Sequence, residues 1–417
     1  MKVAILSDFH FGYAYNSQLE DDSFDNASEA IEKALDSDLI LIGGDLFDSR
    51  VPNTSVWSRA IKILTKPLLQ SDRKVEVVEC SKKLKEISKR TLKHLPVIAI
   101  HGNHERRGKD QPNAVTALEN AGILIHLHCQ TIVLEKDGKK IAIHGMSWVP
   151  ERFAKDVLYQ WNPKPIPGCF NILMLHQSIE PYIYSPLETP SLNLSNLPKG
   201  FDLIIDGHVH LASQEKVGNS ILLFPGSTTS TQFQPSEAQI DKGFYKLDLN
   251  NEINLNFVPL ENNRKFFYEE LKLKDNVSTR EQIERKISDI VHVRNLKKPP
   301  IIRLKLVGKE SQVLDQELRE IERKFSGKAV ISFVKELESP EMTEKLEFLR
   351  NLREQKMSIE EIGLDLLKKN LDELNFKGFD YEQVFRLLSE GDTERAFNLL
   401  TGEQKTLTQI LKKSVIE

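Results

Sequence analysis

Five apolar stretches of this chain each end in side chains of types that bind metal ions. The first stretch, residues 3–6, runs into Asp8 and His10, whose spacing of two predicts that both lie on one side of the chain. The other four stretches end in these residues: Asp45, Asn103 with His104, His176, and His208 with His210. Short apolar runs indicate buried strands of a parallel sheet, and ligands gather beyond the carboxyl ends of such strands. The pattern therefore predicts that these side chains share one site.

A single histidine beside a strand is more often a structural residue with one hydrogen bond than a metal ligand. Carboxylate, carboxamide and imidazole groups at five strand ends favour metal binding instead. The set offers oxygen and nitrogen but no thiolate, which suits Mn²⁺, Fe²⁺ or Zn²⁺ better than Ca²⁺ or a structural zinc. These residues offer more candidate ligands than one tetrahedral ion needs. We expect two divalent ions that share a carboxylate, as in sites that hydrolyse phosphate esters.

The elements that must position these residues form a layered α/β domain. Apolar residues at helical spacing predict helices over residues 23–35, 58–69 and 81–94. Buried strands are predicted over residues 3–6, 38–42 and 97–100. Shorter strands with turn residues between them follow over residues 123–127, 131–135, 141–144, 171–175, 203–205, 221–224 and 243–247. They are typical of a second half of the same domain.

Beyond a predicted linker at residues 260–264, strands and helices alternate in a smaller unit. Strands are expected over residues 266–273, 301–307 and 329–334, and helices over residues 279–291 and 313–325. This order predicts a small α+β domain. After Pro340 the chain becomes charged and helical, with a capping box at Ser358 and Glu361 and an N-cap at Asp392. The last helices could pack on their own domain or offer an apolar face to a partner, and the sequence favours neither.

Composition narrows the classes of protein that fit. The 57 basic and 61 acidic residues give a net charge of −4, which excludes a uniformly basic nucleic-acid-binding coat but leaves local patches open. The three cysteines lack the spacing of disulfides or metal sites, which favours a reducing compartment. No apolar stretch approaches the roughly 20 residues of a membrane span. We expect a soluble, cytoplasmic protein that is not exported and has no membrane contact.

The ordered motifs of the chain resemble the signature of the calcineurin-like metallophosphoesterases. The motifs are Asp8-Phe9-His10, Gly44-Asp45-Leu46-Phe47-Asp48, Gly102-Asn103-His104-Glu105, His176 and Gly207-His208-Val209-His210. Within that superfamily the chain most resembles the DNA double-strand-break repair nucleases, the branch of SbcD and meiotic recombination eleven. This narrower match rests on residues 8–12, 44–47, 143–146, 173–177 and 224–227.

The resemblance implies a fold and a domain order. A two-sheet metallophosphoesterase α/β sandwich would span residues 1–262, and a capping α+β domain that binds DNA would span residues 265–338. A helical C-terminal region over residues 340–417 would dock on an ATPase. The implied partners are DNA ends, single strands or hairpins, an SMC-like ABC ATPase with a coiled coil, and a second copy of the chain in a homodimer. A nucleoid-associated location would follow in a prokaryote.

The resemblance also implies a role for each site residue. One ion would be held by Asp8, His10, Asp45 and His210, and the other by Asp45, Asn103, His176 and His208. Asp45 would then bridge two divalent ions, with Mn²⁺ as the expected metal. His104 would not bind metal but would stabilise or protonate the leaving oxygen. The implied reaction is two-metal hydrolysis of phosphodiester bonds, by exonuclease and endonuclease action at DNA double-strand breaks.

Two features depart from the nuclease pattern. Relatives usually carry a histidine where this chain has Asp48, which leaves the balance between exonuclease and endonuclease activity open. Residues 71–94 form a basic insertion that we predict to be helical. It is either a solvated helix face or a DNA contact made through Lys82, Lys83, Lys85 and Lys89.

Two other functions stay open at this point. A phosphatase of the same superfamily, acting on protein or small molecules, is expected to have an arginine after Asp48 and another before Gly102. The chain has Ser49 and His101 at these places. A non-catalytic scaffold with this fold is expected to have gaps in the ligand set, and the sequence has none.

Overall fold

The structure is a computed structural model of the chain. It describes residues 1–107, 111–183, 189–250, 253–274, 277–292, 296–309, 314–338, 363–364, 367–368, 371, 380–389 and 391–401. The predicted capping box at Ser358 and Glu361 lies outside these residues. None of the helices within them has the length and hydropathy that crossing a bilayer requires.

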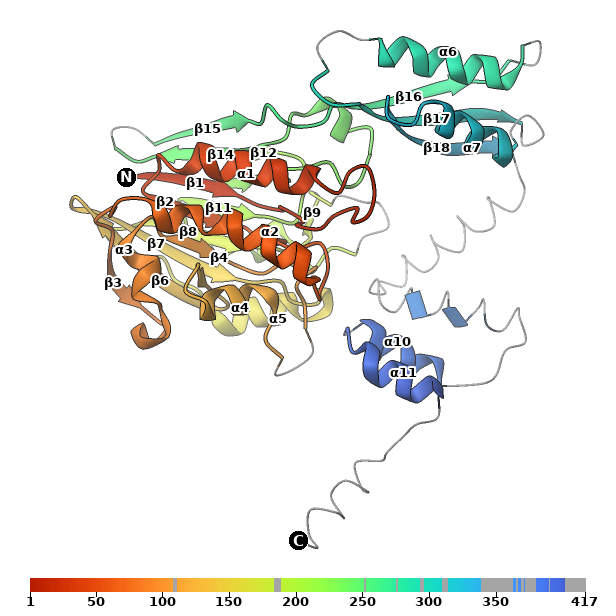
Figure 1. The fold of residues 1–417 in the computed structure, drawn as a ribbon. Coiled ribbons are helices and arrows are strands. Elements are labelled where there is room, and N and C mark those ends of the chain that lie inside the picture. Colours follow the sequence, from red (N-terminus) through yellow and green to blue (C-terminus); the bar gives the residue numbers. More distant parts are fainter. Residues whose placement is uncertain are drawn as a thin grey trace, which may run out of the picture.

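A six-stranded sheet carries three of the five predicted strand ends (Figure 1). Its strands lie in the order β15 (Asn254–Pro259), β14 (Gly243–Asp248), β1 (Lys2–Leu6), β2 (Leu39–Ile42), β4 (Val97–Ala99) and β5 (Ile125–His126). The strands from β1 to β5 run parallel, with Val3 paired to Leu39 and Ile40 to Val97. Because they are parallel, the carboxyl ends of β1, β2 and β4 lie along one edge.

A seven-stranded sheet supplies the other two strand ends. Its strands lie in the order β12 (Ser213–Val217), β13 (Ser220–Phe224), β11 (Leu203–Asp206), β8 (Phe170–Leu175), β7 (Lys139–Met146), β6 (Gln130–Lys136) and β3 (Glu76–Cys80). The four strands from β13 to β7 are parallel. The remaining short elements are β9 (Ile179–Glu180), β10 (Leu192–Asn193), η3 (Leu194–Asn196) and η4 (Glu237–Gln239).

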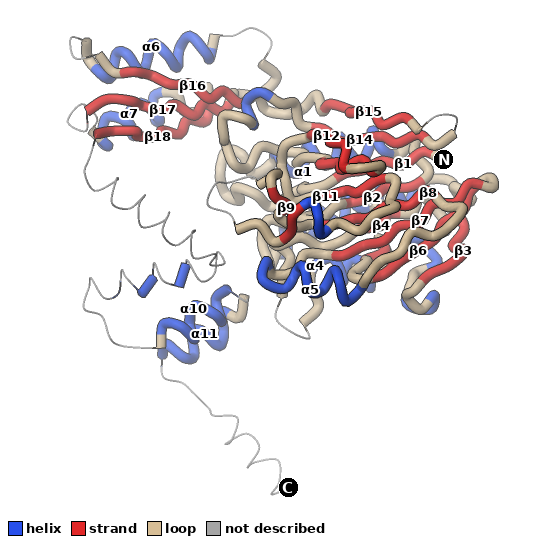
Figure 2. The backbone as a smooth tube through the Cα atoms, turned by 180° about the vertical axis from the view of Figure 1, so that it is seen from behind, coloured by secondary structure: helices blue, strands red, loops and turns tan. Residues whose placement is uncertain are grey.

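The two sheets pack face to face and helices cover their outer faces, as Figures 1 and 2 show from opposite sides. In β1, Val3 and Ile5 join the apolar cluster between the sheets, while Ala4 and Leu6 join the cluster on the outer face. That outer cluster contains side chains of α1 (Asp22–Ala34), α2 (Thr54–Leu64) and α4 (Ala114–Asn120). The outer face of the second sheet packs against α5 (Glu151–Trp161). The predicted two-sheet α/β sandwich is confirmed.

The helix predicted over residues 81–94 is wrong. The preceding residues form β3, which pairs antiparallel with β6, and only η2 (Leu84–Glu86) and α3 (Lys89–Lys93) follow. The apolar residues Val75 and Ile87 are buried between the sheets. They anchor an edge strand and the loop after it, and they do not form the apolar face of a helix. Lys82 is also not an exposed DNA contact. Its ammonium group forms an ion pair of 2.6 Å with Glu119, and its side chain is 10% exposed.

The helix predicted over residues 58–69 is displaced. It begins at Thr54, where the Asn53 side chain accepts a hydrogen bond from the Val56 amide at 2.9 Å. It ends at Leu64, and η1 (Lys66–Leu69) follows around Pro67. Proline has no N–H group to continue the α-helical bonds, which accounts for the change.

A separate three-stranded sheet, here called the cap, follows the sandwich. Its elements are β16 (Phe266–Lys272), α6 (Thr279–Val291), β17 (Ile301–Lys309), α7 (Asp315–Lys324) and β18 (Val330–Glu338). The order of strands and helices is the predicted one, but all three strands are parallel, so two strand–helix–strand crossovers build the unit. Ile287 of α6 and Ile321 of α7 share one buried cluster with Leu304 of β17, so both helices cover the same face.

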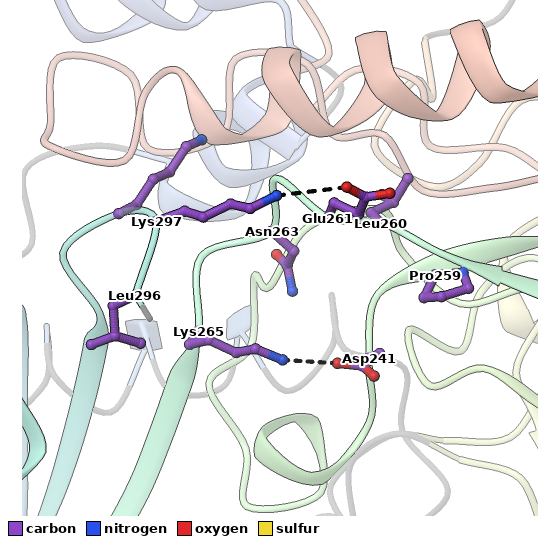
Figure 3. Close-up of a pocket in the computed structure, with 9 residues that line it drawn as sticks. Asp241, Pro259, Leu260, Glu261, Asn263, Lys265, Leu296 and Lys297 are labelled. Carbon is purple, nitrogen blue, oxygen red and sulfur yellow. Dashed lines mark hydrogen bonds and ion pairs between the residues drawn. The ribbon is translucent and has the colours of Figure 1, made fainter. Parts of the chain in front are cut away.

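The cap joins the sandwich at the predicted linker, whose residues are packed and bonded against the sandwich. Leu260 is buried in the sandwich core, and Arg264 makes a buried ion pair with Asp22 of α1. A cavity of about 310 Å³ lies beside this junction (Figure 3). Its lining includes the ion pairs Lys265–Asp241, at 3.1 Å, and Lys297–Glu261, at 3.6 Å.

Two helices, α10 (Tyr381–Ser389) and α11 (Thr393–Thr401), are described in the C-terminal region. They form a hairpin that turns at Gly391, whose φ is +78°. The Asp392 carboxylate accepts a hydrogen bond from the Arg395 amide at 3.2 Å, so the predicted N-cap is confirmed.

Candidate metal centre

The predicted site residues converge where the carboxyl edges of the two sheets meet. Asp8 and His10 follow β1, Asp45 follows β2, and Asn103 follows β4. The histidines of the second sheet follow β8 and β11. A hydrogen bond of 2.8 Å between the His176 Nδ1 atom and the Gly43 carbonyl joins the two edges. Strand ends that are far apart in the sequence thus meet at one site.

Four of the predicted ligands form a buried group of Asp8, His10, Asp45 and His210, whose ligand atoms lie within 4.8 Å of one another. The Nε2 atoms of His10 and His210 are 3.2 Å apart. Asp8 Oδ1 lies 3.5 Å from His210 Nε2 and 3.9 Å from His10 Nε2. This group contains the residues that the family resemblance assigns to the first ion.

The residues assigned to the second ion also lie close to Asp45. His176 Nε2 is 3.3 Å from Asp45 Oδ2 and 3.2 Å from Asn103 Oδ1. The ring of His208 is 5.4 Å from the ring of His176, in an edge contact. The Asp45 carboxylate therefore faces both groups, as a bridging ligand must.

His104 lies beside both groups and is more exposed than the buried ligands. Its ring makes an edge contact of 4.8 Å with the ring of His10, and its side chain is 35% exposed. The Nδ1 atom is 2.7 Å from the Asp48 carbonyl, so Nε2 is the nitrogen that can reach a substrate. Burial lowers the pKa of His104, but Asp45 and the Asp48 carbonyl outweigh it, and the net pKa is raised.

The electrostatics of the group fit divalent cations. Neither carboxylate oxygen of Asp8 has a hydrogen-bond partner among the described residues, although the side chain is fully buried. A buried carboxylate is costly unless it is paired or binds a metal. Burial raises the pKa of Asp45, yet the neighbouring histidines hold it well below its usual range. Burial lowers the pKa of His176, but Asp45 raises it to about 10. Both carboxylates thus attract positive charge.

The loops that carry these residues have unusual backbone conformations. Asp8, His10 and Asp45 have φ values of +52°, +48° and +47°, in the left-handed region that side chains rarely adopt. Gly44 has a φ of +110°, and a Cβ atom there would collide with His176 Nδ1. A Cβ atom on Gly102 would collide with the Asp45 carboxylate. Only glycine allows the loops to approach this closely.

Three contacts of the site were not predicted from the sequence. The Asp48 carboxylate lies 3.2 Å from His10 Nδ1, so the residue that departs from the nuclease pattern faces a predicted ligand. The Glu105 carboxylate accepts hydrogen bonds from the amides of Phe47, at 2.7 Å, and Gly102, at 2.8 Å, which joins two site loops. Burial and the nearby Asp45 raise the pKa of Glu105 to about 8. Glu105 belongs to a recognised motif, but its contacts carry no sequence signal.

The third contact involves Thr231, whose Oγ1 atom lies 2.8 Å from His210 Nδ1. Metal-binding histidines commonly use their second ring nitrogen in this way, which fixes the orientation of the ring. Thr231 lies in a loop after β13, and no sequence pattern marks it.

Comparisons with known proteins agree with this geometry. The family described as calcineurin-like phosphoesterase matches residues 1–212. The double-strand break repair protein MRE11 of Encephalitozoon cuniculi is 26% identical over 435 residues, which cover 99% of this chain and 73% of that protein. The DNA double-strand break repair protein Mre11 of Methanopyrus kandleri is 26% identical, over 59% of this chain and 52% of that protein. MRE11 of Homo sapiens is also 26% identical, over 65% of this chain and 42% of its own length.

The chain therefore spans about half the length of the latter two relatives. All three carry names from double-strand break repair, in agreement with the resemblance to that nuclease branch. The family match covers more than half of the chain and includes every predicted ligand. This protein belongs to the calcineurin-like phosphoesterase family.

Proposed function

We propose that this protein is a metal-dependent nuclease that hydrolyses phosphodiester bonds at DNA double-strand breaks. The observation that carries the proposal is the position of Asp45, whose carboxylate faces His10 at 4.0 Å and His176 at 3.3 Å. This arrangement suits two divalent ions that share one ligand. The repair proteins to which the chain is similar support DNA as the substrate.

We assign the first ion to Asp8, His10, Asp45 and His210, and the second to Asp45, Asn103, His176 and His208. Oxygen and nitrogen donors without thiolate suit Mn²⁺, which we propose as the metal. Bound divalent ions supply charge stabilisation and an activated water for the attack on phosphorus. The task of the protein is to hold these side chains in place and keep the substrate phosphate over them.

His104 is proposed to donate a proton to the leaving oxygen. The Asp48 carbonyl accepts from Nδ1, which leaves Nε2 as the nitrogen that carries the donated proton. A general acid must carry a proton, and the nearby Asp45 and the Asp48 carbonyl raise the pKa of His104 above its ordinary value despite its burial. The residue has no place in either ligand set, so its replacement should separate chemistry from metal binding.

The division into a nuclease domain (1–262), a DNA-binding cap (265–338) and a C-terminal ATPase-docking region (340–417) is part of this proposal. So are the SMC-like ABC ATPase, the homodimer, and a cytoplasmic location with association to the nucleoid in a prokaryote. One feature supports a partner for the C-terminal region. The hairpin of α10 and α11 leaves the large apolar side chains of Leu388 and Leu400 50% and 51% exposed.

The test is His104→Ala, with His292→Ala, at the exposed residue that follows α6, as the matched control. We expect cleavage of end-labelled duplex DNA in Mn²⁺ to fall by about 10²–10⁴-fold in the first variant, the usual contribution of a general acid. Mn²⁺ binding, measured by calorimetry, should stay at the wild-type level in both. Undiminished cleavage by His104→Ala would show that the assigned role is wrong.

The same assay separates the competing functions. A wild-type protein that hydrolyses a phosphomonoester in Mn²⁺ but leaves duplex, hairpin and single-stranded DNA intact would be a phosphatase. A protein that binds no divalent metal would be a scaffold.

A further inference from the structure

A buried ion pair lies outside the proposed ligand sets, directly behind His210. The Lys242 ammonium group is 2.6 Å from Glu237 Oε1, and the two side chains are 3% and 1% exposed. Glu237 opens η4, and Lys242 precedes β14. Burying two charges carries a desolvation cost that only well-placed partners offset. The partners of this pair therefore indicate what it does.

Lys242 uses its remaining hydrogens on the segment that carries a predicted ligand. It donates to the His210 carbonyl at 3.1 Å and to the Ser227 hydroxyl at 2.8 Å. With Glu237, these acceptors satisfy the three donors of an ammonium group. The backbone of His210 is thus fixed from behind by a charged side chain.

Glu237 holds a second segment, residues 231–233. Its carboxylate accepts hydrogen bonds from the amides of Thr231 at 3.3 Å, Gln232 at 3.1 Å and Phe233 at 2.7 Å. Three consecutive amides directed at one carboxylate fix the turn that they form. That turn includes Phe233 with a φ of +53°.

The two segments meet again at the His210 ring. Thr231 Oγ1 lies 2.8 Å from His210 Nδ1, and the Thr231 carbonyl accepts from the Tyr13 hydroxyl at 3.0 Å. The ion pair therefore contacts His210 in two ways. Lys242 binds the backbone of His210, and Glu237 holds Thr231, which contacts the His210 ring. A partner on the second ring nitrogen sets which nitrogen faces a metal.

The same segment also contacts the cap. The ring of Phe233 lies 5.4 Å from that of Phe266 in β16, and Arg303 of β17 donates to the Gln232 carbonyl at 3.4 Å. A displacement of residues 231–233 would thus alter the contacts of both the His210 ring and the cap.

We propose that Glu237 and Lys242 are positioning residues, which hold the backbone and the ring of His210 in the geometry for binding the first ion. This inference rests on the proposed function only in that His210 binds a metal. It predicts that the pair contributes to metal affinity and not to folding stability alone.

The experiment compares Lys242→Met and Glu237→Gln with Lys82→Met in the full chain. Lys82→Met breaks another buried pair, Lys82–Glu119 at 2.6 Å, whose side chains are 10% and 8% exposed. All three variants should unfold at a lower temperature. Calorimetric titration with Mn²⁺ should show affinity reduced by about 10–100-fold in the first two, as for other partners of metal ligands, and unchanged in Lys82→Met.

A milder pair of variants covers the case in which the ion-pair variants do not fold. Thr231→Val removes the hydroxyl at His210 Nδ1 and keeps the shape, and Thr231→Ser restores the hydroxyl. We expect weaker Mn²⁺ binding in the first and near wild-type binding in the second. If the wild type binds Mn²⁺ and both Lys242→Met and Thr231→Val bind it as tightly, the inference is wrong. If the wild type itself binds none, the proposed function fails instead.

Discussion

A glycine in a site loop has less free space around its Cβ position than a glycine in an ordinary turn. Gly44 has a φ of +110° and faces His176 so closely that a Cβ atom would overlap Nδ1. Gly138 also has a positive φ, of +74°, but the space around its Cβ position is open to 4 Å. The two glycines share a backbone requirement and differ in crowding.

This difference leads to a matched test. Gly138→Ala should cost only the backbone strain, about 1–2 kcal/mol of unfolding free energy, and leave metal binding intact. Gly44→Ala carries at least this strain, because its φ of +110° lies further from the left-handed region, and it also displaces His176. We therefore expect it to weaken Mn²⁺ binding by at least tenfold, or about 1.4 kcal/mol. Calorimetric titration and urea unfolding of both variants measure the two effects. Equal Mn²⁺ affinity in the two proteins would contradict the crowding argument.

Much of the site could be predicted at this scale, because residue type and strand order were sufficient. Asp8, Asp45 and His176 each follow an apolar strand, and parallel strands bring their ends together. Thr231 could not be predicted, because its hydroxyl meets His210 only after two distant loops have folded. The Glu105 contacts were hidden for the same reason, since they join residues 47 and 102 through space.

Individual elements were predictable where one face is apolar. α6 begins and ends at the predicted residues because Ile283, Ile287 and Ile290 form a buried stripe at helical spacing. β3 is an edge strand with three exposed residues of five, so charged side chains mask its alternation. β12 was missed for the same reason, since its three central residues are exposed.

One element carries a testable pH effect. His144 on β7 is 2% exposed, lies 2.9 Å from the Thr131 hydroxyl and meets the edge of Phe201. Burial lowers its pKa to about 4. An unfolded histidine titrates near pH 6.5. Between these values the unfolded chain binds more protons, so stability is lost as the pH falls from about 6.5 toward 4.

His144→Gln should flatten this acid limb, because glutamine stays neutral. The difference in unfolding free energy between pH 7 and pH 4.5 should shrink by about 2–3 kcal/mol relative to the wild type. Urea unfolding at the two pH values measures it, with His292→Gln, at the exposed residue that follows α6, as the control. An identical pH dependence in all three proteins would show that folding does not lower the pKa of His144.

For the whole molecule, the cap is attached to the sandwich through contacts of Arg264 and Lys298. Arg264 bonds Asp22 through two nitrogens, at 2.6 and 3.0 Å, and also donates to the Pro299 carbonyl at 2.6 Å. Lys298 reaches the same Asp22 at 3.2 Å. The order of elements in the cap could be predicted from sequence, but this junction could not, because a linker with an arginine usually lies in solvent.

Breaking the junction should loosen the cap before the sandwich. Arg264→Met leaves a buried carboxylate with a single partner, a change that typically costs about 3–5 kcal/mol. Hydrogen exchange should accelerate in β16, β17 and β18 while β1 and β2 stay protected. The control is Lys265→Met, because Lys265 and its partner Asp241 are each 62% exposed and such pairs contribute only about 0–1 kcal/mol. Uniform acceleration throughout the chain would contradict this local role.

The left-handed backbone at Asp8, His10 and Asp45 affects the whole protein. Each such residue costs about 1–3 kcal/mol, whereas an entire domain is stable by only about 5–15 kcal/mol. Much of the margin of stability against heat is therefore given up at three residues of the proposed metal site. Substitutions at those positions that relieve the backbone strain should raise the thermal stability of the protein, and the resulting variants should be inactive.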